Sequence, residues 1–272
     1  MSGPARPSAP PASAELGRRA ARAQRLAVET PGAAAPLRFA AGLYAVQARA
    51  AEAIEALHVQ RPLSGRLYED AERILGPAET ILAYAADAGP AGLADAARLR
   101  RDDLPSTAAT RLLVYWVGDR SSAEDYISRA ILRPYVETLR RWNVIPDRVH
   151  PRGGCPFCGG PPAIALRRDG AEMEGSRRFL GCALCGGEWH FQRILCPACF
   201  EEDPYKLPAF RAETHAAVRI EACETCRRYV KSIDLSQDAR PIPEVDDLAS
   251  LSMDLWAAGQ GLARIEPGLA GV

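Results

Sequence analysis

Eight cysteines carry the clearest chemical signal in this sequence of 272 residues. They occur as four Cys-x-x-Cys pairs: Cys155/Cys158, Cys182/Cys185, Cys196/Cys199 and Cys223/Cys226. Two such tight turns can clamp one ion from opposite sides, which is the usual design of a tetrahedral four-sulfur site. A disulfide framework would need an oxidising compartment, which nothing in the sequence indicates. The pattern therefore favours metal binding over disulfides or free thiols.

The four pairs form one pattern that is used twice. Each cysteine of the first two pairs has a counterpart 41 residues later, so each unit reads Cys-x2-Cys-x23-Cys-x2-Cys. Because a duplicated unit should carry a complete site, we predict that each unit closes its own. The predicted ligand sets are Cys155, Cys158, Cys182 and Cys185, and then Cys196, Cys199, Cys223 and Cys226. The alternative is a cross-braced arrangement in which the first pair joins the third.

The residue after each pair affects the geometry of the turn. Gly159 and Gly186 stand there in the first unit, and this position often needs a positive φ. The second unit has Phe200 and Arg227 instead, so we expect its turns to be less standard. Four sulfurs suit either zinc, which is redox-inert, or a single rubredoxin-type iron, which can exchange one electron. His190 is a conceivable replacement ligand or thiolate partner, but we expect an ordinary strand histidine.

The elements that position these cysteines follow from the hydrophobic pattern. Helical spacing covers four segments before the first pair: 36–58, 67–88, 108–117 and 123–142. Pro77 predicts a kink or a break in the second of them. After the Pro- and Gly-rich stretch 146–154, short β-type runs occur at 163–166, 178–180, 189–195 and 229–233, and a last helix is expected at 244–258.

The predicted fold class is multidomain α+β. A helical N-terminal domain precedes two small metal modules of the zinc-ribbon type, and a helix follows them. The expected boundaries are a disordered tail at 1–13, the helical domain at 14–148, the first four-cysteine module at 149–190, the second at 191–235, and the C-terminal helix and tail at 236–272.

Composition excludes several classes of function. Lys+Arg and Asp+Glu both number 34, and this zero net charge disfavours bulk binding of nucleic acid or anionic membrane. It has no run of 18 apolar residues and no apolar signal segment at its start, so we expect a cytoplasmic protein without a membrane span. No nucleophile–base set or phosphate loop appears, which predicts that the chain is not an enzyme. Arg-Arg pairs near the β-type runs leave a zinc-ribbon nucleic-acid binder as a lesser alternative.

Five segments around the cysteines occur in a characteristic order. They are Cys-Pro-Phe-Cys-Gly-Gly-Pro-Pro (155–162), Phe-Leu-Gly-Cys-Ala-Leu-Cys-Gly-Gly-Glu-Trp-His (179–190), Arg-Ile-Leu-Cys-Pro-Ala-Cys (193–199), Ile-Glu-Ala-Cys-Glu-Thr-Cys-Arg-Arg-Tyr-Val-Lys (220–231) and Asp-Asp-Leu-Ala-Ser-Leu (246–251). Together they resemble the formate dehydrogenase accessory protein family, FdhE, from about residue 150 to 265.

The resemblance implies a cytoplasmic, chaperone-like bacterial protein. Proteins of this family act in the biogenesis of respiratory formate dehydrogenase and contact its catalytic subunit before export. The family implies two rubredoxin-like modules with the eight cysteines as ligands and iron as the favoured ion, zinc being the other candidate. The competing hypothesis is an electron-transfer or thiol-redox protein of the rubredoxin type.

A partner-binding protein needs a recognition surface. The segment between the modules carries two aromatic residues among polar neighbours, and aromatic side chains are common binding anchors. We therefore expect the partner to contact Glu188, Trp189, His190 and Phe191. The alternative is that Trp189 and Phe191 pack between the two modules.

Overall fold

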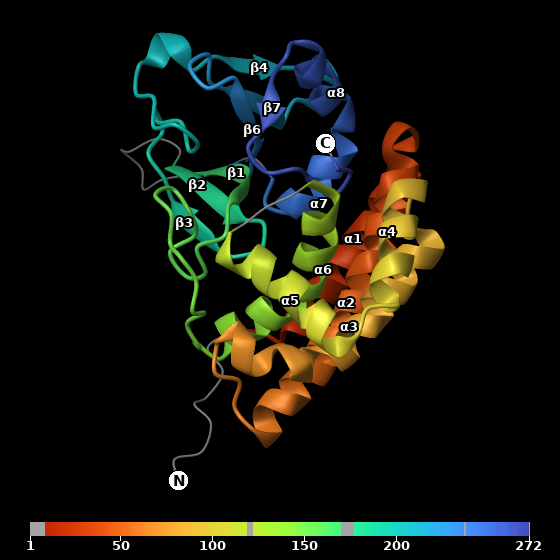
Figure 1. Ribbon diagram of the computed structural model, residues 1–272. Coiled ribbons are helices and arrows are strands. Elements are labelled where there is room, and N and C mark those ends of the chain that lie inside the picture. Colours follow the sequence, from red (N-terminus) through yellow and green to blue (C-terminus); the bar gives the residue numbers. More distant parts are fainter. Residues whose placement is uncertain (1–8, 119–121, 170–176, 237, 272) are drawn as a thin grey trace. The chain divides into compact units, whose positions relative to one another are not determined.

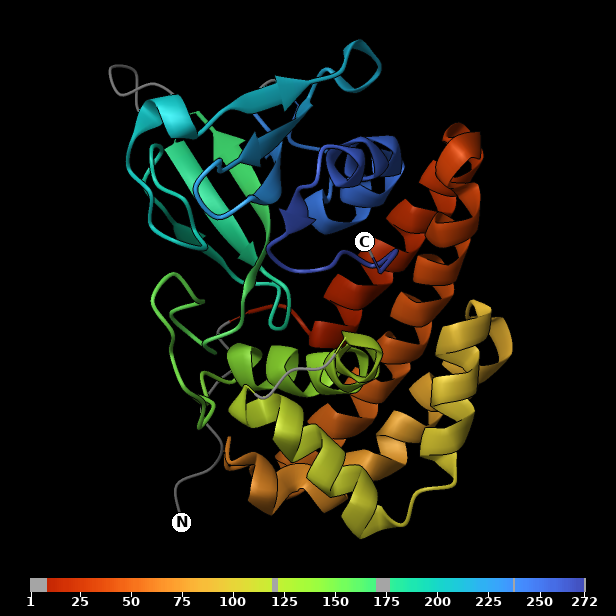
Figure 2. The ribbon, with the colours of Figure 1, turned by 45° about the horizontal axis from the view of Figure 1, so that its top comes forward.

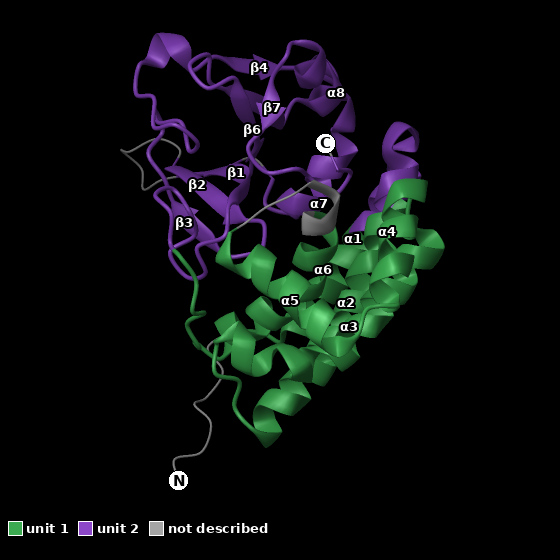
Figure 3. Cartoon of the chain, in the orientation of Figure 1, with its two compact units in different colours: residues 1–22, 38–149 green, residues 23–37, 150–272 purple. Residues whose placement is uncertain are grey.

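The computed structural model describes residues 9–118, 122–169, 177–236 and 238–271. Its contacts divide the chain into two compact units (Figure 3). The first comprises residues 1–22 and 38–149, and the second comprises residues 23–37 and 150–272. Of the predicted disordered tail at 1–13, residues 1–8 lie outside the described part, while Ala12 and Ser13 already belong to the first helix.

The N-terminal part of the chain is helical, as predicted (Figure 1). Its helices are α1 (Ala12–Glu29), α2 (Ala34–Gln60), α3 (Leu67–Ala88), α4 (Ala91–Arg101), α5 (Pro105–Val117) and α6 (Ser122–Arg141). The four predicted segments correspond to α2, α3, α5 and α6, whereas α1 and α4 were not expected as separate helices. Pro77 does not break α3, since the buried residues Ile74, Ala78 and Ile81 keep one face of the helix packed on both sides of it.

Two buried carboxylates tie the helices of the first unit together. Glu137 of α6 accepts hydrogen bonds from Arg19 of α1 at 2.7 and 2.9 Å and from Arg133 at 2.8 Å. Asp70 of α3 accepts from the Tyr135 hydroxyl of α6 at 2.8 Å, and backbone N–H groups before α3 donate to it as well. These bonds satisfy polar groups that would otherwise be costly to bury.

The second unit contains one sheet, visible in Figure 2, which has seven strands. Its strands are β1 (Pro162–Arg168), β2 (Arg177–Cys182), β3 (Glu188–His190), β4 (Ala209–Arg211), β5 (Val218–Ala222), β6 (Arg228–Asp234) and β7 (Ala263–Arg264). The order across the sheet is β3-β2-β1-β6-β5-β4, and β7 pairs with β6. Of the predicted runs, 189–195 forms only the three-residue strand β3. Strands β4, β5 and β7 were not predicted.

The strand order shows the 41-residue repeat in three dimensions. The first repeat lays its strands in the order β3-β2-β1, and the second lays its own in the order β6-β5-β4. Within each repeat the neighbouring strands are antiparallel. The repeats join through β1 and β6, which are parallel, with Ala165 opposite Ser232 and Leu166 opposite Ile233. The strands of the two predicted modules therefore belong to one continuous sheet and not to two separate sheets.

The C-terminal segment covers one face of this sheet. The predicted helix at 244–258 is two helices, α7 (Pro243–Ala249) and α8 (Leu251–Gly259), which meet at Ser250. Met253 and Ala257 of α8 pack on Leu166 and Ile220 in a buried apolar cluster. The chain turns at Ser250 because its buried hydroxyl donates to the Asp247 carbonyl at 2.9 Å and accepts from the Lys231 ammonium at 3.1 Å.

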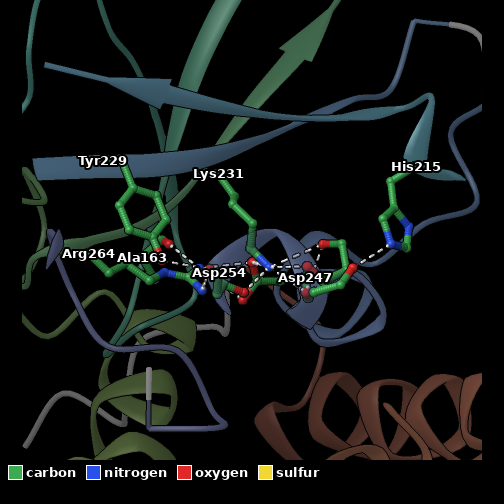
Figure 4. A network of polar contacts seen from close by, with 9 residues as sticks. Ala163, His215, Tyr229, Lys231, Asp247, Asp254 and Arg264 are labelled. Carbon is green, nitrogen blue, oxygen red and sulfur yellow. Dashed lines mark hydrogen bonds and ion pairs between the residues drawn. The ribbon is translucent and has the colours of Figure 1, made fainter. Parts of the chain in front are cut away.

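A buried network of charges fastens these helices to β6 and β7 (Figure 4). Lys231 is fully buried, and its Nζ lies 2.5 Å from Asp254 Oδ2 and 2.9 Å from Asp247 Oδ1. Arg264 donates to both oxygens of Asp247 at 2.8 Å, and the Tyr229 hydroxyl donates to Asp254 at 2.9 Å. Burial works against ionisation of Asp247, yet Arg264 and Lys231 hold its pKa below the usual range. Two cations and two anions thus compensate one another inside the unit.

None of the helices described is long and apolar enough to span a membrane.

Candidate metal centres

The structure gathers the eight cysteines into two groups of four. In each group the sulfur atoms all lie within 4.8 Å of one another. The groups are Cys155, Cys158, Cys182 and Cys185, here called the first site, and Cys196, Cys199, Cys223 and Cys226, the second site. Each group comes from one repeat, which is the arrangement that the repeat predicts, and neither mixes pairs of both units. Metal ligation by these residues stays a prediction.

The sulfur spacing within each group fits a metal ion. The distances are 3.6 Å for Cys155/Cys185, 3.5 Å for Cys158/Cys182, 3.8 Å for Cys196/Cys226 and 3.6 Å for Cys199/Cys223. A tetrahedron with metal–sulfur bonds of about 2.3 Å has edges of about 3.8 Å. A disulfide would hold its sulfurs about 2.05 Å apart. The geometry therefore suits a four-sulfur tetrahedral ion, either zinc or iron.

All four turns that carry the cysteines have the same backbone bond. In each turn the N–H of the first cysteine donates to the carbonyl five residues later, at 2.9 or 3.0 Å. The donor–acceptor pairs are Cys155/Gly160, Cys182/Gly187, Cys196/Glu201 and Cys223/Arg228. This shared bond closes each Cys-x-x-Cys segment into a compact loop, and both of its sulfurs belong to the same group of four.

The residue after each pair has a positive φ in all four turns. The φ angles are 66° at Gly159, 62° at Gly186, 64° at Phe200 and 55° at Arg227. The expectation that the second unit has less standard turns is therefore wrong, because Phe200 and Arg227 adopt the backbone of glycine. A side chain in this region costs about 1–2 kcal/mol, so other contacts must offset that strain.

Those contacts are visible for both residues. The Phe200 ring lies under the guanidinium of Arg152, 3.9 Å from the ring centroid. Arg227 donates from Nη2 to the Gln260 carbonyl just after α8, and its own carbonyl accepts from the Ala263 N–H at 2.9 Å. A cation near the C-terminal end of a helix is favourable. Both side chains thus connect the second site to its surroundings.

The two sites differ in their access to solvent. All four cysteines of the first site are buried, while in the second Cys199 is exposed and Cys226 is half-buried. Burial raises the pKa of the Cys182 thiol in the first site. Burial also disfavours the Cys199 thiolate, but the N–H of Glu201 and the neighbouring thiols outweigh it and lower the Cys199 pKa. A bound cation would hold such buried sulfurs in their ionised form.

A glycine next to the first site has no room for a side chain. A Cβ at Gly160 would lie 2.7 Å from Cys182 Sγ and 3.2 Å from Cys158 Sγ. The repeat counterpart of Gly160 is Glu201, whose carboxylate accepts from the N–H of Asp203 at 3.0 Å and from the Thr225 hydroxyl at 2.5 Å. Sequence reasoning missed Gly160, although the pair Gly159-Gly160 after Cys158 was a usable signal.

The predicted partner-contact residues divide into two kinds. Glu188 and His190 are exposed, and Glu188 forms ion-pair hydrogen bonds with Arg168 at 2.8 and 2.9 Å. Trp189 and Phe191 are half-buried and pack against the buried cluster that contains Leu180. His190 belongs to neither group of sulfurs, and its ring meets the Phe179 ring edge-on at 5.9 Å. Contact of these residues with a partner stays a prediction.

Comparison with known proteins gives consistent matches. Residues 154–193 match the model described as "FdhE, central domain", and residues 194–269 match "FdhE, C-terminal domain". The "Protein FdhE homolog" of Aquifex aeolicus is 35% identical over 117 residues, which are 43% of this chain and 41% of that protein. The homologue of Pseudomonas aeruginosa is 38% identical over 122 residues, which are 42% of this chain and 38% of that protein. The sequence match thus spans only about two fifths of these relatives.

The structural likeness extends further along the chain. The crystal structure of the FdhE protein from Pseudomonas aeruginosa superimposes with a TM-score of 0.67 at 25% sequence identity. The superposition covers 93% of this chain and 94% of that one. It therefore includes the helical part, which lies outside the residues that the two domain models match.

Proposed function

Since this chain belongs to the FdhE family, we propose that it serves formate dehydrogenase as an accessory protein. In this role it binds the catalytic subunit in the cytoplasm during maturation and performs no catalysis of its own. The matches to both FdhE domain models and the two four-cysteine groups support the proposal. No single Cys-x-x-Cys pair would carry it, because such pairs occur in many zinc and redox proteins.

We further propose that each cysteine group holds one metal ion, with iron favoured by the family resemblance. Cys155, Cys158, Cys182 and Cys185 would hold the first ion, and Cys196, Cys199, Cys223 and Cys226 the second. Bound iron would supply one-electron chemistry, whereas bound zinc would be structural. The turns orient the sulfurs, and backbone N–H groups stabilise their charge, as at Cys182, which accepts from Leu184 at 3.3 Å and from its own partner Cys185 at 3.4 Å.

The most informative experiment combines elemental analysis of the bound metal with affinity capture of the formate dehydrogenase catalytic subunit. The purified full chain should contain two equivalents of metal by elemental analysis, and iron would add the visible bands of thiolate-to-metal charge transfer. An affinity-tagged chain expressed with formate dehydrogenase should retain the catalytic subunit. Capture of no catalytic subunit, with the metal content intact, would overturn the accessory role.

The exposed pair Glu188 and His190 is the proposed contact for the partner. Double substitution Glu188→Ala/His190→Ala should leave the metal content unchanged, because neither residue belongs to a sulfur group. The same variant should retain less catalytic subunit and give lower formate dehydrogenase activity in cells. Full capture by the metal-replete variant would remove this surface from the proposal but leave the accessory role standing.

One observation favours a second candidate, rubredoxin-like electron transfer. Cys199 is exposed, so an electron could reach the second site without crossing a protein shell. The discriminating measurement is a reversible one-electron potential at the second site together with capture of the catalytic subunit. A redox-active site in a chain that captures no catalytic subunit would favour electron transfer as the main role.

A further inference from the structure

One face of the sheet concentrates arginine, which the linear sequence does not show. Residues directly opposite one another in neighbouring strands point to the same face of a sheet. Arg167 of β1 lies opposite Arg178 of β2 and opposite Asp234 of β6. Arg219 of β5 lies opposite Arg211 of β4. Four strands therefore direct arginines to one face.

These arginines crowd one another. Arg167, Arg211 and Arg219 line a hollow of about 10 Å³, together with Ser232 and Asp234. That volume holds about one water molecule, so the hollow is a surface feature and not a pocket for a small molecule. Burial lowers the pKa of Arg167, and the positive charges of Arg219 and the nearby Arg193 lower it further. Like charges held this close favour a bound anion.

Internal acids compensate only part of this charge. Glu221, on the same face, accepts from Arg178 at 2.8 Å and from Arg219 Nε at 2.9 Å. Asp234 lies beside Arg167, and the attraction of Arg167 and Arg219 helps to lower its pKa. Arg193 and Arg211 add exposed positive charge beyond these pairs. Among the described residues of this face, the arginines thus outnumber the carboxylates.

The basic face is not the one that the C-terminal helices cover. Met253 and Ala257 of α8 pack on Ile164, Leu166 and other residues that alternate with Arg167 and Arg219 along their strands. Because successive side chains point to opposite faces, the arginines lie on the other side of the sheet. The helices α7 and α8 therefore do not cover these arginines, of which Arg193 and Arg211 are exposed, Arg167 and Arg219 half-buried, and Arg178 buried.

We propose that this basic face, defined by Arg167, Arg193, Arg211 and Arg219, binds an acidic polypeptide segment. The proposal rests on the accessory role and names the chemistry by which the client is recognised. Guanidinium groups recognise carboxylates with paired hydrogen bonds, and Arg219 already donates from both Nε and Nη2 to Glu221. The acids on the face, and the zero net charge of the chain, disfavour a nucleic acid backbone.

The test reverses charge on the face without touching its internal pairs. The variant Arg193→Glu/Arg211→Glu changes two exposed residues, and the control Arg98→Glu/Arg240→Glu makes the same change in charge elsewhere. Two probes are used, the formate dehydrogenase catalytic subunit and a short fluorescein-labelled poly-Glu peptide. The face variant should bind both about tenfold more weakly or worse, the control should bind as wild type does, and added salt should weaken wild-type binding. Unchanged metal content and circular dichroism establish that the variants are folded.

The outcomes separate this proposal from the accessory role. Unchanged binding of both probes by the face variant, or equal loss in the control, overturns the basic face. Single-stranded RNA that binds as tightly as the peptide and loses affinity in the same variant overturns the assignment to a polypeptide. If wild type binds the peptide at the basic face but captures no catalytic subunit, the accessory role fails while the binding of acidic segments stands.

Discussion

The two cysteine sites are built from loops of the same geometry but differ in their exposure to solvent. Their turns share the closing hydrogen bond and the positive φ, and their sulfurs have nearly the same spacing. The first site is fully buried, whereas Cys199 of the second is exposed. The comparison teaches that the local motif sets the ligand geometry, while the tertiary environment sets the access of solvent, chelators and partners to the ligands.

Counterpart positions of the two repeats can differ in burial. His190 and Lys231 are counterparts at the 41-residue offset, on β3 and β6. His190 is exposed at a sheet edge, while Lys231 is fully buried under α7 and α8. Strand β3 lies at one end of the strand order, whereas β6 lies in its middle, on the face that the C-terminal helices cover. Counterpart strands of the duplicated unit therefore differ in position: β3 is an edge strand, and β6 is part of the buried core.

Metal removal should give the largest effect and should separate the two units. Strong chelation should expose 155–233 to protease and leave 35–143 resistant, because structural zinc contributes about 10–16 kcal/mol to small metal modules. Metal should leave in two phases, with the exposed second site first. Limited proteolysis with mass spectrometry, and a chromogenic chelator followed over time, measure both.

Two results would break this expectation. Loss of helicity throughout the chain on chelation would show that the helical unit depends on the metals. Release in a single phase would show that exposure of Cys199 does not control metal loss. Re-addition of metal serves as the control for irreversible damage.

The second largest effect is expected for the counterparts Lys231 and His190, whose substitution should change the free energy of unfolding by very different amounts. Lys231→Met should lower the free energy of unfolding by about 3–5 kcal/mol, because Asp247 and Asp254 would share only Arg264 as a buried cation. His190→Ala should change it by less than about 0.5 kcal/mol. Urea denaturation followed by circular dichroism compares them. Equal effects at both positions would contradict the assignment of Lys231 to the core.

A methyl group beside the sulfurs should damage the first site alone. Gly160→Ala places Cβ against Cys182 Sγ, so we expect a destabilisation of about 1–3 kcal/mol and faster metal loss from the first site. Glu201→Ala at the counterpart position removes a surface carboxylate but adds no clash. Metal retention under a mild chelator, measured per site in variants with one site disabled, checks this. Normal retention by Gly160→Ala would mean that the sulfur can move at little cost.

The smallest expected effect concerns position 200, where a glycine variant should be more stable than an alanine variant, the reverse of the usual order. At Phe200 the positive φ strains any side chain, so Phe200→Gly should be more stable than Phe200→Ala by about 1 kcal/mol. Both should be less stable than wild type, since both lose the contact with Arg152. Thermal unfolding of the metal-loaded variants gives the order. An alanine variant as stable as the glycine variant would show that the turn relaxes.

Much of the molecule was predictable because it depends on local pattern. Helical spacing of apolar residues located α2, α3, α5 and α6, and the 41-residue offset of the cysteines assigned each to its group. The helices α1 and α4 escaped notice because their sequences are rich in Ala and Arg and contain few large apolar residues. Phe200 and Arg227 misled the turn prediction because contacts outside the turn, with Arg152 and Gln260, sustain their backbone.

The sequence by itself determined which cysteines gather into each group of four and the helical character of the N-terminal part. Both follow from spacing along the chain. Apolar residues three or four apart share one face of a helix, and two cysteines three apart share one tight turn. Only the tertiary structure decided that β1 and β6 join the repeats into one sheet, that Lys231 is buried while His190 is exposed, and that arginines from four strands share a face. The physical reason is that strand pairing over long sequence separations and burial are set by the whole unit, which brings distant residues together according to packing and charge.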